Sequence, residues 1–254
     1  MRAIKLTLAY DGTDYAGWQR QEQEQPTIQG VLEEALARMT DAPVILHGAG
    51  RTDAGVHARG MVAHFHTRST IPPHGLLRGV NSMLPRDIRV MAAENVAIDF
   101  HARYNATGKR YIYSFLVGGI MPPLLFRYAA WVRPPFAMEA VRQCLPLLIG
   151  THDFSSFEAT GSRDRSLEQG RGAVRTILEA RLDKDTSEPG LHHLAITGDG
   201  FLRHMVRNIA GTLFEVGAGR IGPGDFAGII AARDRTLAGP TAPACGLVLD
   251  TVLY

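Results

Sequence analysis

The sequence predicts an α+β fold with two ferredoxin-like (βαββαβ) halves, whose mainly antiparallel sheets flank a central cleft. The chain has 254 residues, of which 45% are apolar, so it can bury one large core or two small ones. Residues 1–102 show the order strand, helix, strand, strand, helix, strand, which is the ferredoxin-like arrangement. Residues 103–254 repeat this order without a residue-level repeat. Two such halves would leave a cleft that suits a long ligand.

The elements of the first half follow from the spacing of apolar residues and from helix-breaking residues. Apolar and polar side chains alternate over residues 4–10, which predicts a strand with one buried face. Pro26 and Thr27 start a helix with apolar residues every three or four positions, and Asp41 and Pro43 end it. The other predicted elements are a short strand at 44–46, a tight loop from residue 48, a strand at 61–67, a helix at 76–84 and a strand at 88–92.

The second half shows patterns of the same kinds. A helix is predicted from residue 203 to residue 216, with Gly217 as its stop. Segment 160–172 is polar, contains glycine and is rich in Arg, which fits a mobile loop, a solvated insertion or an RNA clamp. The other predicted elements are strands at 109–117, 174–183 and 191–197, a helix at 137–149, a short helix that begins near 223–225 and a closing strand at 247–253.

Composition narrows the class of protein. The chain contains no apolar run near the roughly 18 residues of a membrane span, and its N-terminus lacks a signal-peptide core, which predicts a cytoplasmic protein with no membrane partner. Cys144 and Cys245 match no metal or redox spacing. The net charge of +2 does not by itself indicate nucleic acid. The 24 Arg against 3 Lys favour phosphate contacts or reflect an Arg-rich codon usage, and both interpretations stay open.

The glycine-rich stretch over residues 48–66, GAGRTDAGVHARGMVAHFH, combines a candidate nucleophile with a cation. Arg51 and Asp53 are two residues apart, so in an extended segment their side chains emerge on one side and can pair. A neighbouring cation favours the charged carboxylate, which an attacking aspartate requires. An ordinary loop ion pair explains the same spacing.

Histidines in and beside this stretch raise a second possibility. His64 and His66 face the same way on the predicted strand and, with His47 and His57, allow a metal site. The stretch contains no Cys and no HExxH spacing, so buried or surface histidines are the alternative interpretation.

Basic residues form two further candidate surfaces. Over residues 101–113 they lie among Tyr104, Tyr111 and Tyr113. This pattern fits a surface that binds looped RNA and fits equally well a strand with a solvent-exposed edge. Arg203 and Arg207 are four residues apart and share a face of the predicted helix, where a solvated basic face is the alternative. The candidates for RNA contact are Arg103, Lys109, Arg110, Arg203, Arg163 and Arg165.

Seven segments together resemble the tRNA pseudouridine synthase A family and follow that family's order along nearly the whole chain. The most specific part is GRTDAGVHA, a combination that rarely arises by chance. The segments are YDGTDYAGWQRQ, GAGRTDAGVHARGMVAHF, DFHARYNATGKRYIY, THDFSSF, VRTI, FLRHMVRNIAGTL and GLVL. The resemblance implies the pseudouridine synthase fold and an isomerase that modifies tRNA.

The resemblance also implies the substrate and the site. The expected reaction converts uridine to pseudouridine at nucleotide positions 38, 39 and 40 of the tRNA anticodon stem-loop, in a homodimer with one tRNA spanning both subunits. Asp53 matches the nucleophile, and Arg51 matches the arginine that pairs with it and holds the flipped-out nucleotide. Tyr111 matches the tyrosine that stacks on the target base, Arg207 the basic residue that pairs with the catalytic carboxylate, and Leu247 the apolar residue beside the uracil.

Segment 160–172 departs from the family in length and content, which puts in doubt the RNA contacts of that loop but not the chemistry. The reaction needs no cofactor and no metal, because the uracil leaves C1′, turns over and reattaches through C5 without redox change. Two other functions stay open: a catalytically silent tRNA-binding or folding module of the same fold, and a metal-dependent hydrolase using His57, His64 and His66. The first has no need of Asp53, and the second would lose its activity to a chelator.

Overall fold

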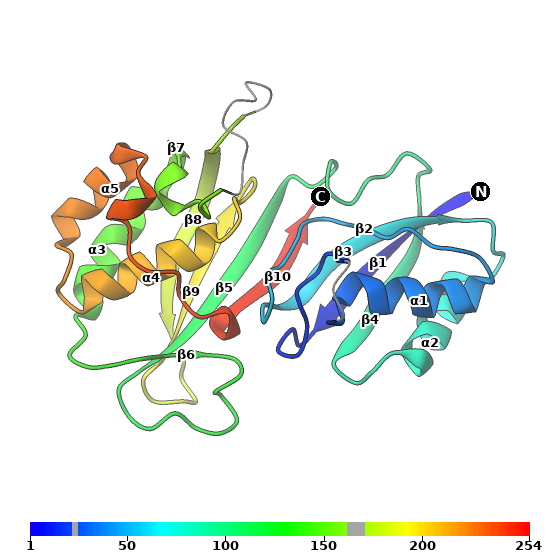
Figure 1. Cartoon of the computed structure of the whole chain (residues 1–254), viewed down its shortest axis with the longest axis horizontal. Helices are drawn as coiled ribbons and strands as arrows, with labels where there is room; N and C mark the ends of the chain where they lie inside the picture. The colour runs from blue at the N-terminus through cyan, green and yellow to red at the C-terminus, as the bar shows by residue number, and fades with distance from the viewer. Residues whose placement is uncertain (22–24, 162–170) are drawn as a thin grey trace. The chain divides into compact units, whose positions relative to one another are not determined.

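The computed structural model describes residues 1–21, 25–161 and 171–254. The chain forms two compact units, the first comprising Met1–Thr107 and Val248–Tyr254 and the second comprising Gly108–Leu247. Both units combine helices with a mostly antiparallel sheet, which confirms the predicted α+β class (Figure 1). Among the described residues, no helix is both long and apolar enough to cross a membrane.

The first unit has the split arrangement of strands that the sequence predicts. The central strand β1 (Arg2–Tyr10) pairs antiparallel with β3 (His57–Thr67) on one side and with β4 (Ile88–Val96) on the other. The free edge of β3 carries β2 (His47–Gly48) in antiparallel pairing and β10 (Leu247–Leu253) in parallel pairing. Helices α1 (Ile28–Thr40) and α2 (Pro73–Met83) pack together on the same side of this sheet (Figure 1).

Local sequence explains why α1 forms where it does. The Thr27 side chain accepts a hydrogen bond from Gly30 N, which satisfies one of the free N–H groups at the helix start. Asp41 ends the helix with a φ of 51°, a left-handed conformation that aspartate tolerates. Ile28, Leu32 and Leu36 lie on one face and are fully buried, each contributing about 1.5–3 kcal/mol of burial free energy.

The predicted strand at residues 44–46 is wrong. The Leu46 N–H donates to Glu33 Oε1 over 2.9 Å, and the Leu46 carbonyl accepts from Gln29 Nε2 over 3.0 Å. Side chains of α1 therefore bond the backbone groups that a neighbouring strand would otherwise use. The short strand β2 follows only at His47.

Two other boundaries in the first unit also differ from the prediction. β3 begins at His57 rather than at residue 61 and contains Gly60, which the sequence had suggested to be part of a loop. A Cβ on Gly60 would lie 2.4 Å from the carbonyl oxygen of Asp250, so this glycine allows β10 to approach closely. α2 begins at Pro73 rather than at residue 76, because proline fits the first helical position, where its missing N–H costs nothing.

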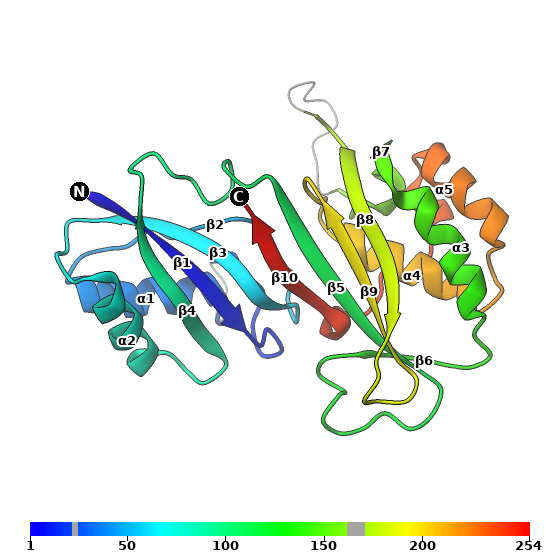
Figure 2. The same cartoon turned by 180° about the vertical axis from the view of Figure 1, so that it is seen from behind.

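The second unit contains a sheet in the order β5–β9–β8–β7, with antiparallel pairing throughout. Its helices pack against one another, and β8 and β9 pass in front of α4 in the rear view (Figure 2). The strands are β5 (Gly108–Val117), β6 (Ala130–Val132), which pairs parallel with β5, β7 (Gly150–Asp153), β8 (Val174–Lys184) and β9 (Leu191–Gly198). The helices are α3 (Met138–Leu148), α4 (Met205–Gly217) and α5 (Phe226–Ala232), with short 3-10 turns at Ser155–Phe157, Pro223–Asp225, Arg235–Leu237 and Ala244–Gly246.

One correction in the second unit affects a candidate residue. The helix predicted from residue 203 begins at Met205, because His204 has a φ of 63°, which is incompatible with a right-handed helix. Arg203 therefore precedes α4 and does not share a helix face with Arg207. The short strands β6 and β7 were not predicted, whereas the short helix expected to begin near 223–225 is confirmed as a 3-10 turn that leads into α5.

Candidate functional site

The loop between β2 and β3 presents Arg51 and Asp53 on a tight turn. The Asp53 carbonyl accepts a hydrogen bond from Val56 N over 3.1 Å, and Gly55, at the third position of the turn, has a φ of 75°. Only glycine adopts that angle without strain, as a type II turn requires at this position. The predicted glycine-rich loop is thus present in residues 49–56, and Asp53 opens its turn.

The segment YDGTDYAGW supports this turn by close backbone contact. A Cβ on Gly12 would lie 2.1 Å from the Val56 carbonyl oxygen, and a Cβ on Gly17 would lie 2.6 Å from that of Thr52. Trp18 N donates to Thr52 O over 3.0 Å, and the Tyr10 hydroxyl shares a 2.8 Å hydrogen bond with Thr52 Oγ1. The backbone of this segment therefore packs directly against the turn, and the contact leaves no room for side chains at the two glycines.

Arg51 extends from the same loop and is exposed. Its Nε donates to Gln19 Oε1 over 3.1 Å. The remaining N–H donors of the guanidinium are all on Nη1 and Nη2, so this bond leaves the outer edge of the guanidinium available for a ligand. Gln19 is a partner that spacing within the loop did not predict.

Tyr111 lies in the second unit on β5, where its Cα pairs with Ile196 of β9. The residue is 8% exposed, and its ring meets that of Phe201 edge-on with centroids 5.0 Å apart. Two residues along the same face, the Tyr113 hydroxyl donates to Pro243 O over 2.7 Å. Burial raises the pKa of Tyr113 above its ordinary value, so Tyr113 is a neutral structural side chain.

Arg207 is fixed on α4 by two hydrogen bonds to one residue. Its Nε donates to Ala242 O over 2.8 Å, and Ala242 N donates to Arg207 O over 3.1 Å. A Cβ on Gly211, one helical turn further on, would lie 1.7 Å from Pro240 O, so α4 and this segment touch backbone to backbone. The guanidinium is therefore held at Nε, as it is in Arg51.

The same segment leads to Leu247. The fully buried Asn208 donates from Nδ2 to Phe157 O and accepts from Thr241 Oγ1, which ties the segment to α4. Gly246 approaches β5 so closely that a Cβ would lie 2.6 Å from Ser114 O. Leu247 follows as a side chain that is 6% exposed. Within the second unit, the structure thus fixes the backbone that leads into this residue.

The structure describes four of the candidate RNA contacts, one in the first unit and three in the second. Arg103 follows β4 in the first unit and is exposed, and its backbone N–H donates to His101 Nδ1. Lys109 and Arg110 are adjacent on β5 in the second unit and therefore face opposite sides of the sheet. Arg203 is exposed and lines a groove of about 1090 Å³ with His204. Arg163 and Arg165 lie outside the described residues.

His47, His64, His66 and His101 form a cluster of rings in the first unit. The centroid of the His64 ring lies 5.1 Å from that of His47, 5.7 Å from that of His66 and 4.7 Å from that of His101. Burial, followed by repulsion from the neighbouring imidazoles, lowers the pKa of His64 to about 4. Among the described residues, no group of three or more His, Cys, Asp or Glu side chains is arranged to hold a metal ion.

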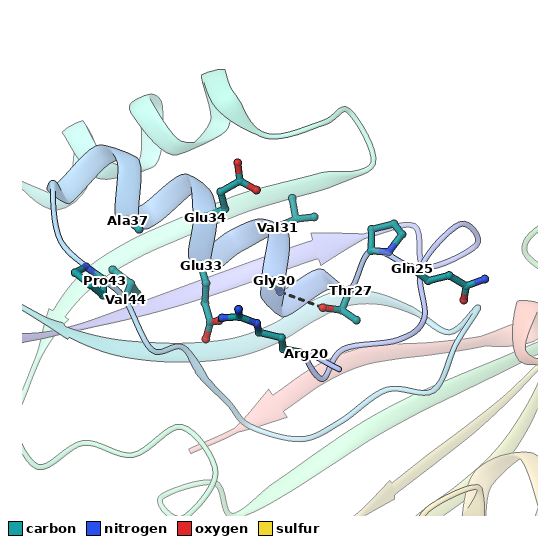
Figure 3. Close-up of a pocket in the computed structure, with 11 residues that line it drawn as sticks. Arg20, Gln25, Thr27, Gly30, Val31, Glu33, Glu34, Ala37, Pro43 and Val44 are labelled. Carbon is teal, nitrogen blue, oxygen red and sulfur yellow. Dashed lines mark hydrogen bonds and ion pairs between the residues drawn. The ribbon is translucent and has the colours of Figure 1, made fainter. Parts of the chain in front are cut away.

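Three polar residues that support the Arg51 loop were not predicted as site residues from the sequence: Gln19, Gln29 and Glu33. Gln29 and Glu33 lie on α1 and are each 8% exposed. Glu33 also lines a groove of about 650 Å³ with Arg20, and its Oε2 lies 3.7 Å from Arg20 Nη1 (Figure 3). The sequence signal that could have identified Gln29 and Glu33 is their spacing, because they are polar residues four positions apart on an otherwise apolar helix face.

Known proteins resemble this chain over its whole length. A family profile described as tRNA pseudouridine synthase matches residues 7–105 and 145–254. A relative named tRNA pseudouridine synthase A 1, from Desulfotalea psychrophila, is 51% identical over 254 residues, which is all of both chains. Relatives named tRNA pseudouridine synthase A from Moorella thermoacetica and Clostridium kluyveri are 44% and 43% identical, again over all of both chains.

Similarity to solved structures is much weaker. A structure titled "Crystal Structure of a Cbf5-Nop10-Gar1 Complex" aligns with 83% of this chain and 54% of its own chain, at 13% identity and a TM-score of 0.28. That score is too low to carry an argument about fold or function.

Proposed function

The chain belongs to the tRNA pseudouridine synthase family, and we propose that it isomerises uridine to pseudouridine at nucleotide positions 38, 39 and 40 of the tRNA anticodon stem-loop. The observation that carries this proposal is the glycine turn that presents Asp53 beside Arg51. The turn is held by the backbone of the YDGTDYAGW segment, so its carboxylate is placed before the substrate arrives.

Each site residue has a proposed role that its surroundings support. Asp53 is the nucleophile, and Arg51, held at Nε, pairs with it and retains the flipped-out nucleotide. Tyr111 stacks on the target base, which suits a buried ring already packed against Phe201. Arg207, also held at Nε, pairs with the catalytic carboxylate, and the apolar Leu247 lies beside the uracil.

The chemistry requires these residue types. The target base leaves its stack at a cost of about a few kcal/mol before the reaction. An ionised aspartate then attacks C1′ of the ribose or C6 of the uracil, or assists a glycal route, and the uracil reattaches through C5. Water would hydrolyse the intermediate, so apolar side chains such as Leu247 and Tyr111 keep the site dry. The protein itself supplies every group that this isomerisation uses.

We also propose the wider setting of the reaction. The tRNA meets the basic residues Arg103, Lys109, Arg110 and Arg203, with phosphates as their natural ligands. The protein acts as a homodimer in the cytoplasm, where the free thiols of Cys144 and Cys245 suit a reducing environment.

One assay tests the function and its nucleophile together. The purified protein is incubated with an unmodified tRNA transcript, without added metal or cofactor, and pseudouridine is mapped in the anticodon arm. We expect product from the parent protein and none from Asp53→Asn, which binds tRNA but lacks the attacking carboxylate. Tight binding without product from the parent protein would instead indicate a silent tRNA-binding module.

A further inference from the structure

A chain of hydrogen-bonded side chains leads from Arg51 into helix α1. Arg51 Nε donates to Gln19 Oε1 over 3.1 Å, and Gln19 Nε2 donates to Gln29 Oε1 over 2.7 Å. Gln29 Nε2 then donates to Glu33 Oε1 over 3.0 Å. All four residues belong to the first unit, so the exposed loop is connected to the interior of that unit by side chains alone.

The chemistry of the two end residues fixes the donor-to-acceptor direction of this chain of hydrogen bonds. A guanidinium only donates hydrogen bonds and a carboxylate only accepts them, so each glutamine between them has one possible amide orientation. Backbone groups agree with that orientation, because Arg20 N donates to Gln29 Oε1 and Gln29 Nε2 donates to Leu46 O. Every bond is therefore polarised in the same sense, from the cation to the carboxylate, and the bonds strengthen one another.

Burial makes the inner end of the chain rigid. Gln29 and Glu33 are each 8% exposed, and buried polar groups keep their hydrogen bonds because losing one leaves its partner unsatisfied. Glu33 Oε1 also accepts from Leu46 N, which fixes the backbone that leads into β2 and the Arg51 loop. The outer end, in contrast, is a long exposed arginine that would lose rotamer freedom when it binds a ligand.

We propose that Gln29 and Glu33 are positioning residues for the reaction, which hold Gln19 so that its Oε1 fixes the Arg51 guanidinium before tRNA binds. The proposal rests on the proposed function, because it assigns the chain's effect to Arg51 of the catalytic loop. The proposal also gives a role to Gln19 and Arg20 of the segment YDGTDYAGWQRQ. Neither residue takes part in the proposed isomerisation itself. Figure 3 shows the side chains of Glu33 and Arg20 next to each other.

The decisive variant is Gln29→Met, which keeps the length of the side chain and removes its amide. We expect the nitrogen–proton NMR signal of Arg51 Nε, assigned by its absence in Arg51→Ala, to shift in the protein without tRNA. We expect the single-turnover rate to fall about tenfold, while the tRNA concentration for half-saturation changes less than about twofold, since positioning affects the transition state more than binding.

Thr27→Ala is the matched control on the same helix. It removes the cap on Gly30 N shown in Figure 3 and lowers the stability of α1 without breaking the chain. Well below the unfolding temperature, it should leave the Arg51 signal and the single-turnover rate unchanged. An equal loss of rate in Thr27→Ala would overturn the proposal by assigning the effect to helix stability.

A double variant tests whether Gln29 acts through Arg51. In the Arg51→Ala background, Gln29→Met should cause no further loss of rate. A further tenfold loss, or an unmoved Arg51 signal in Gln29→Met, would overturn the positioning role while the parent enzyme remains a synthase. A parent protein that makes no pseudouridine would overturn the proposed function and the positioning role together, and the NMR signal would still report whether the chain holds Arg51.

Discussion

Gly17 supports the Asp53 turn because it has no side chain. Its φ of 93° lies in the left-handed region, and a Cβ there would lie 2.6 Å from the Thr52 carbonyl oxygen. Gly17→Ala would therefore strain the backbone and also displace the turn. We expect a loss of about 2–4 kcal/mol in the free energy of unfolding, measured by urea denaturation, together with a loss of pseudouridine formation.

Gly119 provides the matched control for this substitution. Its φ is 62°, but among the described residues no atom beyond its two chain neighbours lies within 4 Å of the position that a Cβ would take. Gly119→Ala should therefore cost only about 1 kcal/mol, from backbone strain, and leave turnover unchanged. Equal losses in the two variants would show that contact with the turn adds nothing to the cost of strain.

At the scale of elements, the histidine cluster joins β2, β3 and the segment after β4 and should make folding sensitive to pH. Burial, together with His101, His47 and His66, lowers the pKa of His64 to about 4. A histidine in the unfolded chain titrates near 6.5, so the unfolded state binds the extra proton first as the pH falls. His64 thus contributes its full stability above about pH 6.5 and loses it progressively towards pH 4, at up to about 1.4 kcal/mol per pH unit.

His64→Asn is the variant that tests this contribution. His64 Nδ1 accepts a hydrogen bond from Ala102 N over 3.1 Å, and the carbonyl of an asparagine side chain can accept a bond from the same donor. We expect the pH slope of the unfolding free energy between pH 6.5 and 4.5 to become flatter by about one proton, in urea titrations at several pH values. An unchanged slope would assign the pH dependence to other groups.

Local sequence patterns predicted most elements of both units. They failed where residues far away in the sequence determine the secondary structure. Thr27 marks the start of α1, because capping depends only on the next three residues. Residues 44–46 are apolar enough to suggest a strand, but bonds from Gln29 and Glu33 to Leu46 replace the pairing. Helix α4 starts late because the spacing of apolar residues carries no information about the φ of His204.

At the scale of the whole molecule, the chain leaves the first unit after Thr107 and returns to it at Val248. The sequence predicts the bounds of the last strand correctly, but not its partner in the first unit. Val248 and Leu249 pair in parallel with His57 and Ala58, and this long-range register leaves no local signature. Motif resemblance supplies the residues of the proposed site, whereas spacing alone leaves Asp53 and Arg51 indistinguishable from an ordinary loop ion pair.

Binding of tRNA by the whole molecule should depend on salt through its exposed arginines. Arg203 is exposed and lines the groove of the second unit, so we expect it to contact a phosphate. Arg203→Ala should then weaken binding to all tRNAs alike and reduce the slope of log affinity against log salt by about 0.7–0.9, measured by filter binding at several salt concentrations.

Arg220→Ala is the control for that experiment, because Arg220 is exposed, does not line the groove and is bonded through Nη2 to Glu215 Oε1 over 2.7 Å. It follows the far end of α4, whose 13 residues separate it from Arg203 by roughly 20 Å along the helix axis. Its removal should leave the salt slope unchanged, since a guanidinium neutralised by a carboxylate releases no counterion from RNA. Equal slopes for Arg203→Ala and the parent protein would show that Arg203 itself meets no phosphate, and would remove it from the proposed tRNA contacts.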